Sequence, residues 1–165
     1  MLHSFAYDRQ WLSCVSDLLG DKAVRSMAEL PQHRPGFSCY DHCLLVSYLS
    51  FAICRRLGWH SWDAARGGLL HDFCLYDWTA GKTPAAWWRH LWGHPRTALR
   101  NAEERFLLTP RERDIIVSHM FPLSLSPHHC REAWVVGLVD KFCATAELLG
   151  LTPRTEPLLS GLQSA

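Results

Sequence analysis

The dipeptide His71-Asp72 combines two side chains that commonly bind divalent metal ions, and it follows an apolar run over residues 64–70. A neutral imidazole nitrogen can ligate one cation, while the two oxygens of the adjacent carboxylate can serve two different cations. Because His-Asp pairs are also common by chance, a metal site requires further ligands that face the same way from other segments.

Two further candidates lie on the apolar faces of predicted helices. His42 shares a helical stripe with apolar residues at i+3, i+4, i+7 and i+11. That stripe consists of Leu45, Val46, Leu49 and Ile53. Asp140 lies in the middle of another predicted helix, among Val136, Val139, Cys143 and Ala144. A carboxylate in such surroundings is unfavourable unless its charge is compensated, and a metal ion compensates it directly.

Two more histidines complete the candidate set. His94 lies in a Gly-His-Pro sequence between two predicted helices, and His119 ends another helix after Ile115-Ile116. Five separate segments thus contribute four His and two Asp, which suit Fe, Mn, Ni, Co or Zn, with Mg also acceptable. Ligands dispersed in this way come together only if several helices pack into a bundle.

The elements that must position these ligands begin with two short helices, over residues 8–20 and 21–29, and a loop rich in Pro and Gly. Ser38 is the predicted N-cap of the next helix, with Asp41 as its acidic partner in the first turn. Gly58 predicts the end of that helix in the left-handed conformation that suits glycine.

The helix after Gly58 is expected over residues 62–72, with Ser61 as its N-cap. Gly67 and Gly68 in this helix would let a neighbouring backbone approach closely. Residues 73–83 are predicted to form a loop that leaves the His-Asp pair.

Prolines punctuate the second half of the chain. Pro84 predicts a short helix that is interrupted at residues 93–95, and Pro95 predicts the start of another helix over 95–107. Thr109 and Glu112 form a capping-box pattern for the helix that reaches residue 119. A last long helix is expected over 130–149, before Gly150 and Pro153.

No segment shows the alternation typical of a β-strand, so the predicted fold is all-α, a compact bundle of about six to eight helices. The expected organisation is an N-terminal helical segment over residues 1–36 that packs on the core, a metal-binding helical domain over 37–150, and a loosely ordered tail over 151–165.

Composition excludes several classes of function. A chain of 165 residues with a formal net charge of +1 has neither the basic footprint of a nucleic-acid-binding protein nor a polybasic membrane patch. Its seven Cys have no CxxC spacing, which favours reduced thiols over a disulfide framework or a zinc ribbon. Without a signal-peptide pattern or a long apolar run, the expectation is a cytoplasmic protein with no membrane partner and no binding to nucleic-acid duplexes.

The order His42, His71-Asp72, Asp140 on consecutive helices resembles the HD superfamily of metal-dependent phosphohydrolases, over roughly residues 37–149. His94 and His119 look like the additional ligands of HD-GYP-type and other multi-metal members. The resemblance implies that Asp72 bridges two metals. The first metal would be held with His42, His71 and Asp140, and the second with His94 and His119.

Three departures separate the chain from the HD-GYP subgroup. Leu75 stands where that subgroup has a Lys, and Ser118-His119-Met120 stands where it has His-His-Glu. Its Gly-Tyr-Pro sequence is absent. The expected substrate is therefore not cyclic di-GMP, and a third metal is not expected.

By this resemblance the chain is expected to be an enzyme that hydrolyses a nucleotide or another small phosphoester with a metal-activated hydroxide at a binuclear site. His71 and Asp72 are the expected catalytic residues. Lys82, Arg96 and Lys141 lie near ligands in the sequence and are candidate phosphate contacts. The oligomeric state is not indicated.

Two alternatives remain open on sequence grounds. Some HD-scaffold proteins are di-iron oxygenases, and the same six ligands would serve that chemistry. The other is a catalytically idle module that senses a nucleotide. Four tryptophans after the His-Asp pair are either packing residues or an aromatic wall for a substrate, namely Trp78, Trp87, Trp88 and Trp92. Five histidines are expected on the surface or in loops: His33, His60, His90, His128 and His129.

Overall fold

The computed structural model describes residues 9–33, 36–77, 80 and 83–152. Of residues 84–87, 89 and 90 it describes the backbone alone. Helices account for all the regular structure of the described residues. Within these residues lie seven α-helices, one 3-10 turn (Met27–Glu29) and a single isolated bridge between Pro31 and Ser38. The helices are α1 (Arg9–Gly20), α2 (Lys22–Ser26), α3 (Cys39–Arg56), α4 (Ser61–Leu70), α5 (Pro84–Glu103), α6 (Pro110–Ser118) and α7 (Arg131–Leu148). The predicted all-α fold is confirmed.

Capping residues define the ends of the helices that carry the site. Ser38 accepts a hydrogen bond from the Asp41 backbone N–H while Asp41 accepts one from the Ser38 N–H, so both halves of a capping box are present. Thr109 and Glu112 form the same arrangement at the start of α6. Gly58 follows α3 with a φ of +68°. These predicted boundaries are confirmed.

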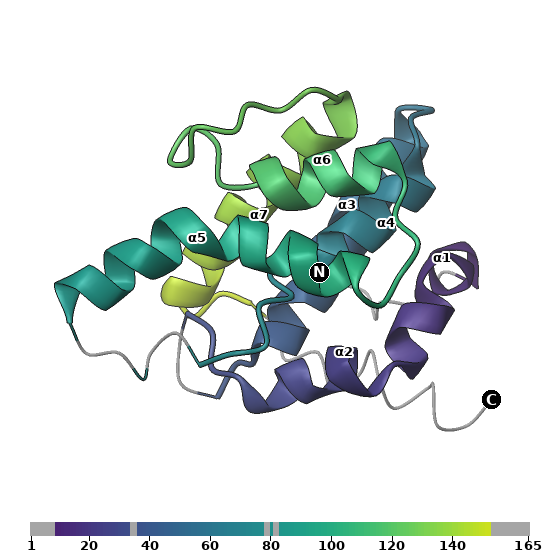
Figure 1. The fold of residues 1–165 in the computed structure, drawn as a ribbon. Coiled ribbons are helices and arrows are strands. Elements are labelled where there is room, and N and C mark those ends of the chain that lie inside the picture. Colours follow the sequence, from purple (N-terminus) through teal and green to yellow (C-terminus); the bar gives the residue numbers. More distant parts are fainter. Residues whose placement is uncertain (1–8, 34–35, 78–79, 81–82, 153–165) are drawn as a thin grey trace.

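The site elements pack around α3 and α4, which lie side by side (Figure 1). α7 packs on α3 and α6, α6 also contacts α4, and α1 covers another part of α4. The close contact between α3 and α4 depends on Gly68, where a Cβ atom would lie 3.0 Å from the Ser47 Cα. The expected close approach of a backbone is thus found at Gly68, whereas at Gly67 a Cβ would lie 2.7 Å from the Ile115 side chain.

The N-terminal helices belong to the same core as α3 and α4. Trp11, Val15 and Leu18 are buried in one cluster with Leu44 and Leu69. The indole N–H of Trp11 donates to the hydroxyl of Ser47, 3.0 Å away. Most of the expected C-terminal tail, residues 153–165, lies outside the described residues.

The predicted interruption of α5 is wrong. The helix runs from Pro84 to Glu103 with Pro95 inside it. Pro95 has no N–H to donate to the carbonyl of Leu91 one turn earlier, which costs the helix one hydrogen bond. Burial of His94, Pro95 and Ala98 against the core offsets this cost of the proline.

Two smaller expectations also fail. Ser61 is the first residue of α4 rather than its N-cap, and His60 occupies the N-cap position without a side-chain hydrogen bond. Ile53 is 40% exposed, because the buried face of α3 has rotated to Phe51 and Cys54 near its C-terminal end.

No helix among the described residues has both the length and the apolar character needed to cross a membrane.

Candidate metal centre

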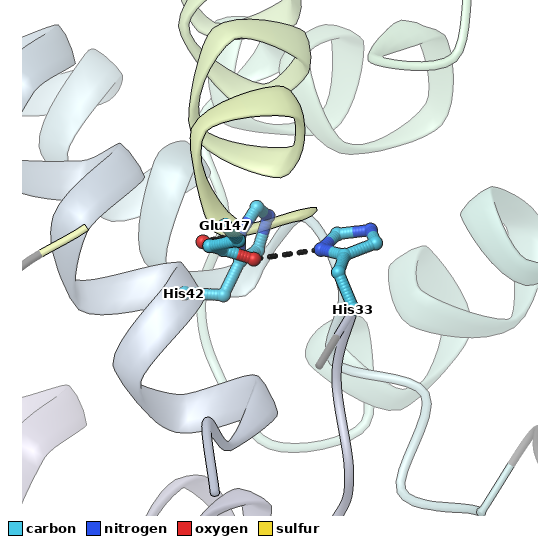
Figure 2. A group of neighbouring side chains, drawn as sticks. All are labelled: His33, His42 and Glu147. Atoms are coloured by element: carbon cyan, nitrogen blue, oxygen red, sulfur yellow. Dashed lines mark hydrogen bonds and ion pairs between the residues drawn. The ribbon is translucent and has the colours of Figure 1, made fainter. Parts of the chain in front are cut away.

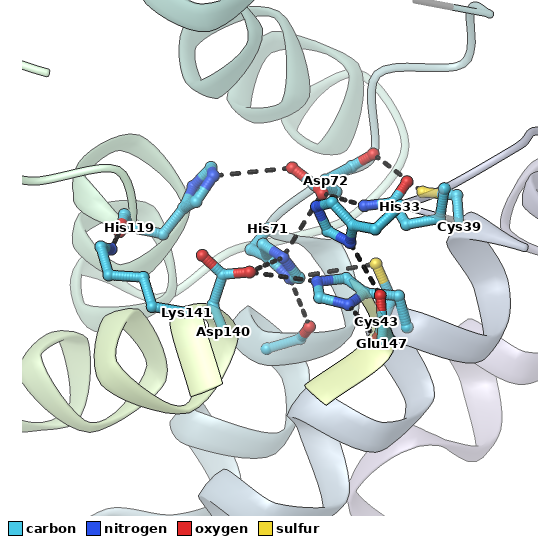
Figure 3. A network of polar contacts seen from close by, with 12 residues as sticks. His33, Cys39, Cys43, His71, Asp72, His119, Asp140, Lys141 and Glu147 are labelled. Carbon is cyan, nitrogen blue, oxygen red and sulfur yellow. Dashed lines mark hydrogen bonds and ion pairs between the residues drawn. The ribbon is translucent and has the colours of Figure 1, made fainter. Parts of the chain in front are cut away.

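The six predicted ligands come from five segments and meet at the ends and inner faces of the helices. His42 is on α3, His94 is in the middle of α5, and Asp140 is in the middle of α7. His71 and Asp72 directly follow α4, and His119 is the C-cap of α6. Figure 3 shows side chains of this group converging on one region. Five of the six are buried, and Asp72 is partly exposed.

His42, His71 and Asp140 form the first part of the site, which we call the Asp140 half. The His42 Nε2 lies 3.1 Å from the Asp140 Oδ1, and the His71 Nε2 lies 3.5 Å from the same oxygen. One ligand atom from each of these residues falls within 4.8 Å of the others, which is close enough to share a metal ion.

Asp72, His94 and His119 form the second part, the His94 half. The Asp72 Oδ1 lies 3.3 Å from the His94 Nε2 and 3.5 Å from the His119 Nε2. The two Nε2 atoms are 2.9 Å apart. The other oxygen of Asp72, Oδ2, lies 3.6 Å from the His71 Nε2, so this carboxylate faces both halves with different atoms.

In His71 and His119, the hydrogen bond that Nδ1 makes determines whether the Nε2 atom carries a lone pair or a proton. The Nδ1–H of His71 donates to the Gly68 carbonyl and that of His119 donates to the Ile116 carbonyl, each at 2.8 Å. In a neutral imidazole this leaves the Nε2 with a lone pair. Metal-binding histidines show the same arrangement, in which the outer nitrogen donates and the inner nitrogen ligates.

The His71 Nε2 is buried and has no hydrogen-bond partner among the described residues. Its neighbours are oxygens of Asp72 and Asp140, which are acceptors, at distances too long for good hydrogen bonds. A nitrogen lone pair beside two carboxylates is repulsive unless a proton or a cation lies between them. The donor set therefore fits a divalent metal ion.

Glu147 and His33 extend the Asp140 half, and neither was predicted. The Nδ1–H of His42 donates to one oxygen of Glu147 and the Nδ1–H of His33 donates to the other, each at 2.7 Å (Figure 2). The buried carboxylate thereby aims the Nε2 of His42 at Asp140. A detectable signal existed for Glu147, which follows Asp140 by seven residues and so shares its helical face. His33 lies in a loop, as expected, but it belongs to the site.

Gln32 is a second residue that sequence patterns did not indicate. Its side-chain amide donates to the Asp72 Oδ2 at 2.9 Å, and the residue is buried. This contact fixes the orientation of the carboxylate that faces both halves. Like His33, Gln32 comes from the loop before α3, where no helical periodicity exists to place it.

Burial would raise the pKa values of Asp72 and Asp140, but the surrounding imidazoles outweigh it. His71 and His94 hold the pKa of Asp72 well below its ordinary value, and His42 and His71 do the same for Asp140. Both residues are therefore carboxylates at neutral pH, which is the state that binds metals.

The pKa values of His42 and His119, one histidine from each half, shift in opposite directions. Burial favours neutral His42, but its contacts with Asp140 and Glu147 raise its pKa well above the ordinary value. For His119, burial and the neighbouring His71 and His94 lower the pKa to about 3. The Asp140 half is thus rich in negative charge, and the His94 half is not.

The site opens into a pocket of about 410 Å³. Asp72, His94, His119 and Asp140 border it, so a molecule in the pocket would lie against both halves. Its volume falls in the range of small-molecule sites.

The predicted phosphate contacts have different outcomes. Lys141 borders the pocket, and its ammonium donates to the carbonyls of His119 at 2.7 Å and Gly137 at 3.1 Å. Burial lowers the pKa of Lys141, although Asp140 opposes the shift. Arg96 is exposed and does not border the pocket, so the structure places it away from the region where a phosphate would meet the candidate ligands. Lys82 lies outside the described residues.

The remaining aromatic and histidine expectations can be settled in part. Trp88 and Trp92 are about half exposed and do not border the pocket, while Trp78 and the Trp87 side chain lie outside the described residues. His60 and His129 are exposed, as predicted. His128 is partly buried, with its Nδ1 2.7 Å from the Ser118 hydroxyl. The His90 side chain is not described.

No family model, no curated protein and no solved structure matches this chain. The geometry of the site itself supports groups of His, Asp and Glu, most of them buried, that can hold a metal ion.

Proposed function

We propose that the chain is a metal-dependent phosphohydrolase of the HD type, which hydrolyses a small phosphoester at a binuclear centre. The observation that carries the proposal is the position of Asp72, which turns Oδ2 to His71 and Oδ1 to His94 and His119. A carboxylate shared by two groups of imidazole ligands is an arrangement in which two divalent cations can be held side by side.

The ligands of the centre have distinct tasks. His42, His71 and Asp140 would hold a first cation, His94 and His119 would hold a second, and Asp72 would contribute to both. Divalent cations in such sites lower the pKa of water from ~15.7 towards ~7 and offset the charge that develops on phosphoryl oxygens. Gln32 and Glu147 keep the carboxylate and imidazole ligands in the orientations that this chemistry needs.

Net charge explains why the substrate would be an anion. Two divalent cations facing the carboxylates of Asp72 and Asp140 leave the centre with a charge of about +2. The carboxylate of Glu147 behind His42 reduces this charge to about +1, which is still positive. A phosphoester that enters the pocket is therefore drawn towards the two halves.

Elemental analysis of protein purified without added metal tests the centre. We expect about two transition-metal ions per chain, and phosphate release from a generic phosphoester with Mn²⁺ or Ni²⁺. His71→Ala should lower both, whereas His60→Ala, which removes a histidine whose side chain is 53% exposed, should change neither. Equal activity of the His71→Ala variant and the unmodified chain would overturn the proposal.

Iron content, O₂ consumption and phosphate release, measured on the same protein, distinguish hydrolysis from oxidation. A centre that contains iron, consumes O₂ and releases no phosphate would identify an oxygenase on the same ligands. A centre that binds metal and a nucleotide without turnover would identify a sensing module. Either result would replace the proposed activity and leave the metal site in place.

A further inference from the structure

The pocket in front of the metal centre has apolar walls that the proposed chemistry does not require. The apolar side chains that border it are Leu30, Pro31, Leu91, Met120, Leu123 and Leu148. They come from the loop before α3, from α5, from the segment after α6 and from the end of α7. Apolar groups from four segments therefore surround any molecule that reaches the metals.

Most charged groups on the described pocket wall are candidate metal ligands. Among the described residues that border the pocket, the carboxylates are the two ligands Asp72 and Asp140, and Lys141 is the single Lys or Arg. The Lys141 ammonium already donates to two backbone carbonyls. The described wall thus offers no cluster of cations for a second or third phosphate.

Few side-chain polar groups on the described wall suit recognition of a nucleobase, and Tyr76 contributes one hydroxyl among them. Gln32 is its one side-chain amide, and that amide donates to Asp72. His33 donates to Glu147. Recognition of a base edge or of a ribose needs several hydrogen-bonding groups aimed at the ligand, and here Gln32 and His33 orient the metal ligands.

The mouth of the pocket exposes apolar surface. Leu123 is 53% exposed and Leu148 is 67% exposed, and both border the pocket. A substrate with an apolar group would cover these side chains when its phosphate reaches the metals, and the loss of water-exposed apolar surface favours binding.

From the apolar walls and mouth we infer that the substrate is a monophosphate ester of an apolar alcohol, rather than a nucleotide. This inference rests on the proposed phosphohydrolase activity and specifies its substrate class. In the reaction, the oxygen of water forms a new bond to phosphorus and the ester P–O bond breaks. The alcohol oxygen leaves with the bonding electron pair and takes up a proton from that water, so the products are inorganic phosphate and the alcohol.

A homologous series tests the substrate class on the metal-loaded protein. The compounds are ethyl, butyl and hexyl phosphate, with a nucleoside 5′-monophosphate and a nucleoside triphosphate for comparison. We expect kcat/KM to rise about fourfold for each CH₂ that the pocket buries. Hexyl phosphate should exceed both nucleotides by at least about tenfold.

Two variants at exposed leucines test whether the pocket causes the preference for hexyl over ethyl phosphate. Leu148→Gln should lower the ratio of kcat/KM for hexyl over ethyl phosphate by about fourfold or more. Leu138→Gln is the matched control, because Leu138 lies on the same helix, is 64% exposed and does not border the pocket. It should leave the ratio unchanged. Since both positions are exposed, neither change threatens the fold.

The outcomes distinguish the substrate class from the activity. Faster hydrolysis of a nucleotide than of hexyl phosphate, or an equal effect of both leucine variants, would overturn the apolar substrate while the phosphohydrolase stands. Absence of phosphate release from every ester, with metal bound, would overturn the activity and the substrate class together.

Discussion

The two halves of the metal centre use the same types of ligand but differ in charge. In the Asp140 half, two histidines face one carboxylate, and Glu147 supports His42 from behind. In the His94 half, the Nε2 atoms of two histidines lie 2.9 Å apart, and both lie close to the carboxylate of Asp72. The pKa of His42 is raised well above its ordinary value, whereas that of His119 falls to about 3.

In the proposed binuclear centre, this difference in charge predicts that the two cations bind with unequal affinity. The Asp140 half attracts positive charge, so protons compete there with a metal ion. In the His94 half, His119 stays neutral and needs no deprotonation, but less negative charge is available to hold a cation. We therefore expect the Asp140 half to bind its metal more tightly at neutral pH.

The largest effect should come from the residue that both halves share. Asp72→Asn keeps the size of the side chain but removes the negative charge and one of the two ligand oxygens. Changes to supporting residues alone cost about 10–100-fold in metal affinity or activity, so loss of this ligand should exceed that range. Metal content and phosphate release measure it. Retention of two metals per chain would show that Asp72 does not bridge the halves.

His119→Ala should separate the halves. The His94 half loses one of its two nitrogens, while His42, His71 and Asp140 are untouched. We expect metal content to fall from about two to about one per chain and phosphate release to fall sharply. Elemental analysis after dialysis measures the stoichiometry. Loss of both metals would mean that the halves fill only together.

The pH dependence of metal uptake tests the charge difference directly. A pKa of His42 raised above its unfolded value of ~6.5 means that part of the metal-free protein is protonated at pH 7. A protonated imidazole cannot ligate, so uptake at the Asp140 half must release protons, and affinity must fall as the pH drops through the raised pKa. Titration calorimetry of His119→Ala in buffers of different ionisation enthalpy measures the release. Proton-free uptake at pH 7 would contradict the charge assignment.

Glu147→Gln should have the smallest effect of the series. The carboxamide preserves one acceptor for the Nδ1–H of His42 but removes the negative charge that supports it. We expect metal affinity of the Asp140 half to weaken by about 10–100-fold, with a smaller change in the His94 half. Glu104→Gln is the control, because Glu104 is an exposed glutamate remote in sequence from the ligands. Equal weakening of both halves would indicate a general loss of structure.

Much of this site could be predicted from local patterns. The apolar stripe of α3 placed His42 on a buried face, and the apolar surroundings of Asp140 marked it as a carboxylate that needs a positive partner. The capping box at Thr109 and Glu112 set the start of α6 and hence the position of His119 at its end. Each of these inferences depends on contacts within a few residues, which sequence spacing reports well.

The errors arose where distant contacts decide the outcome. Gly93-His94-Pro95 has the local signature of a helix end, yet α5 continues because its residues on this turn are buried against the core. The continuous helix directs His94 towards Asp72 more rigidly than a loop would. Arg96 was assigned from its nearness to His94 in sequence, but two residues along a helix turn a side chain to a different face.

Local patterns predicted the all-α fold and most of the capping sites, because periodicity and capping are local properties of the chain. The six candidate ligands, with Asp72 as the shared carboxylate, were expected from residue types together with the HD resemblance. The packed structure was needed to find that Glu147 joins His42 to His33 and that Gln32 orients the carboxylate of Asp72. These contacts join residues that are 40 positions apart for Gln32 and Asp72, 105 for His42 and Glu147, and 114 for His33 and Glu147. No short-range pattern encodes such separations, since packing of the whole bundle sets them.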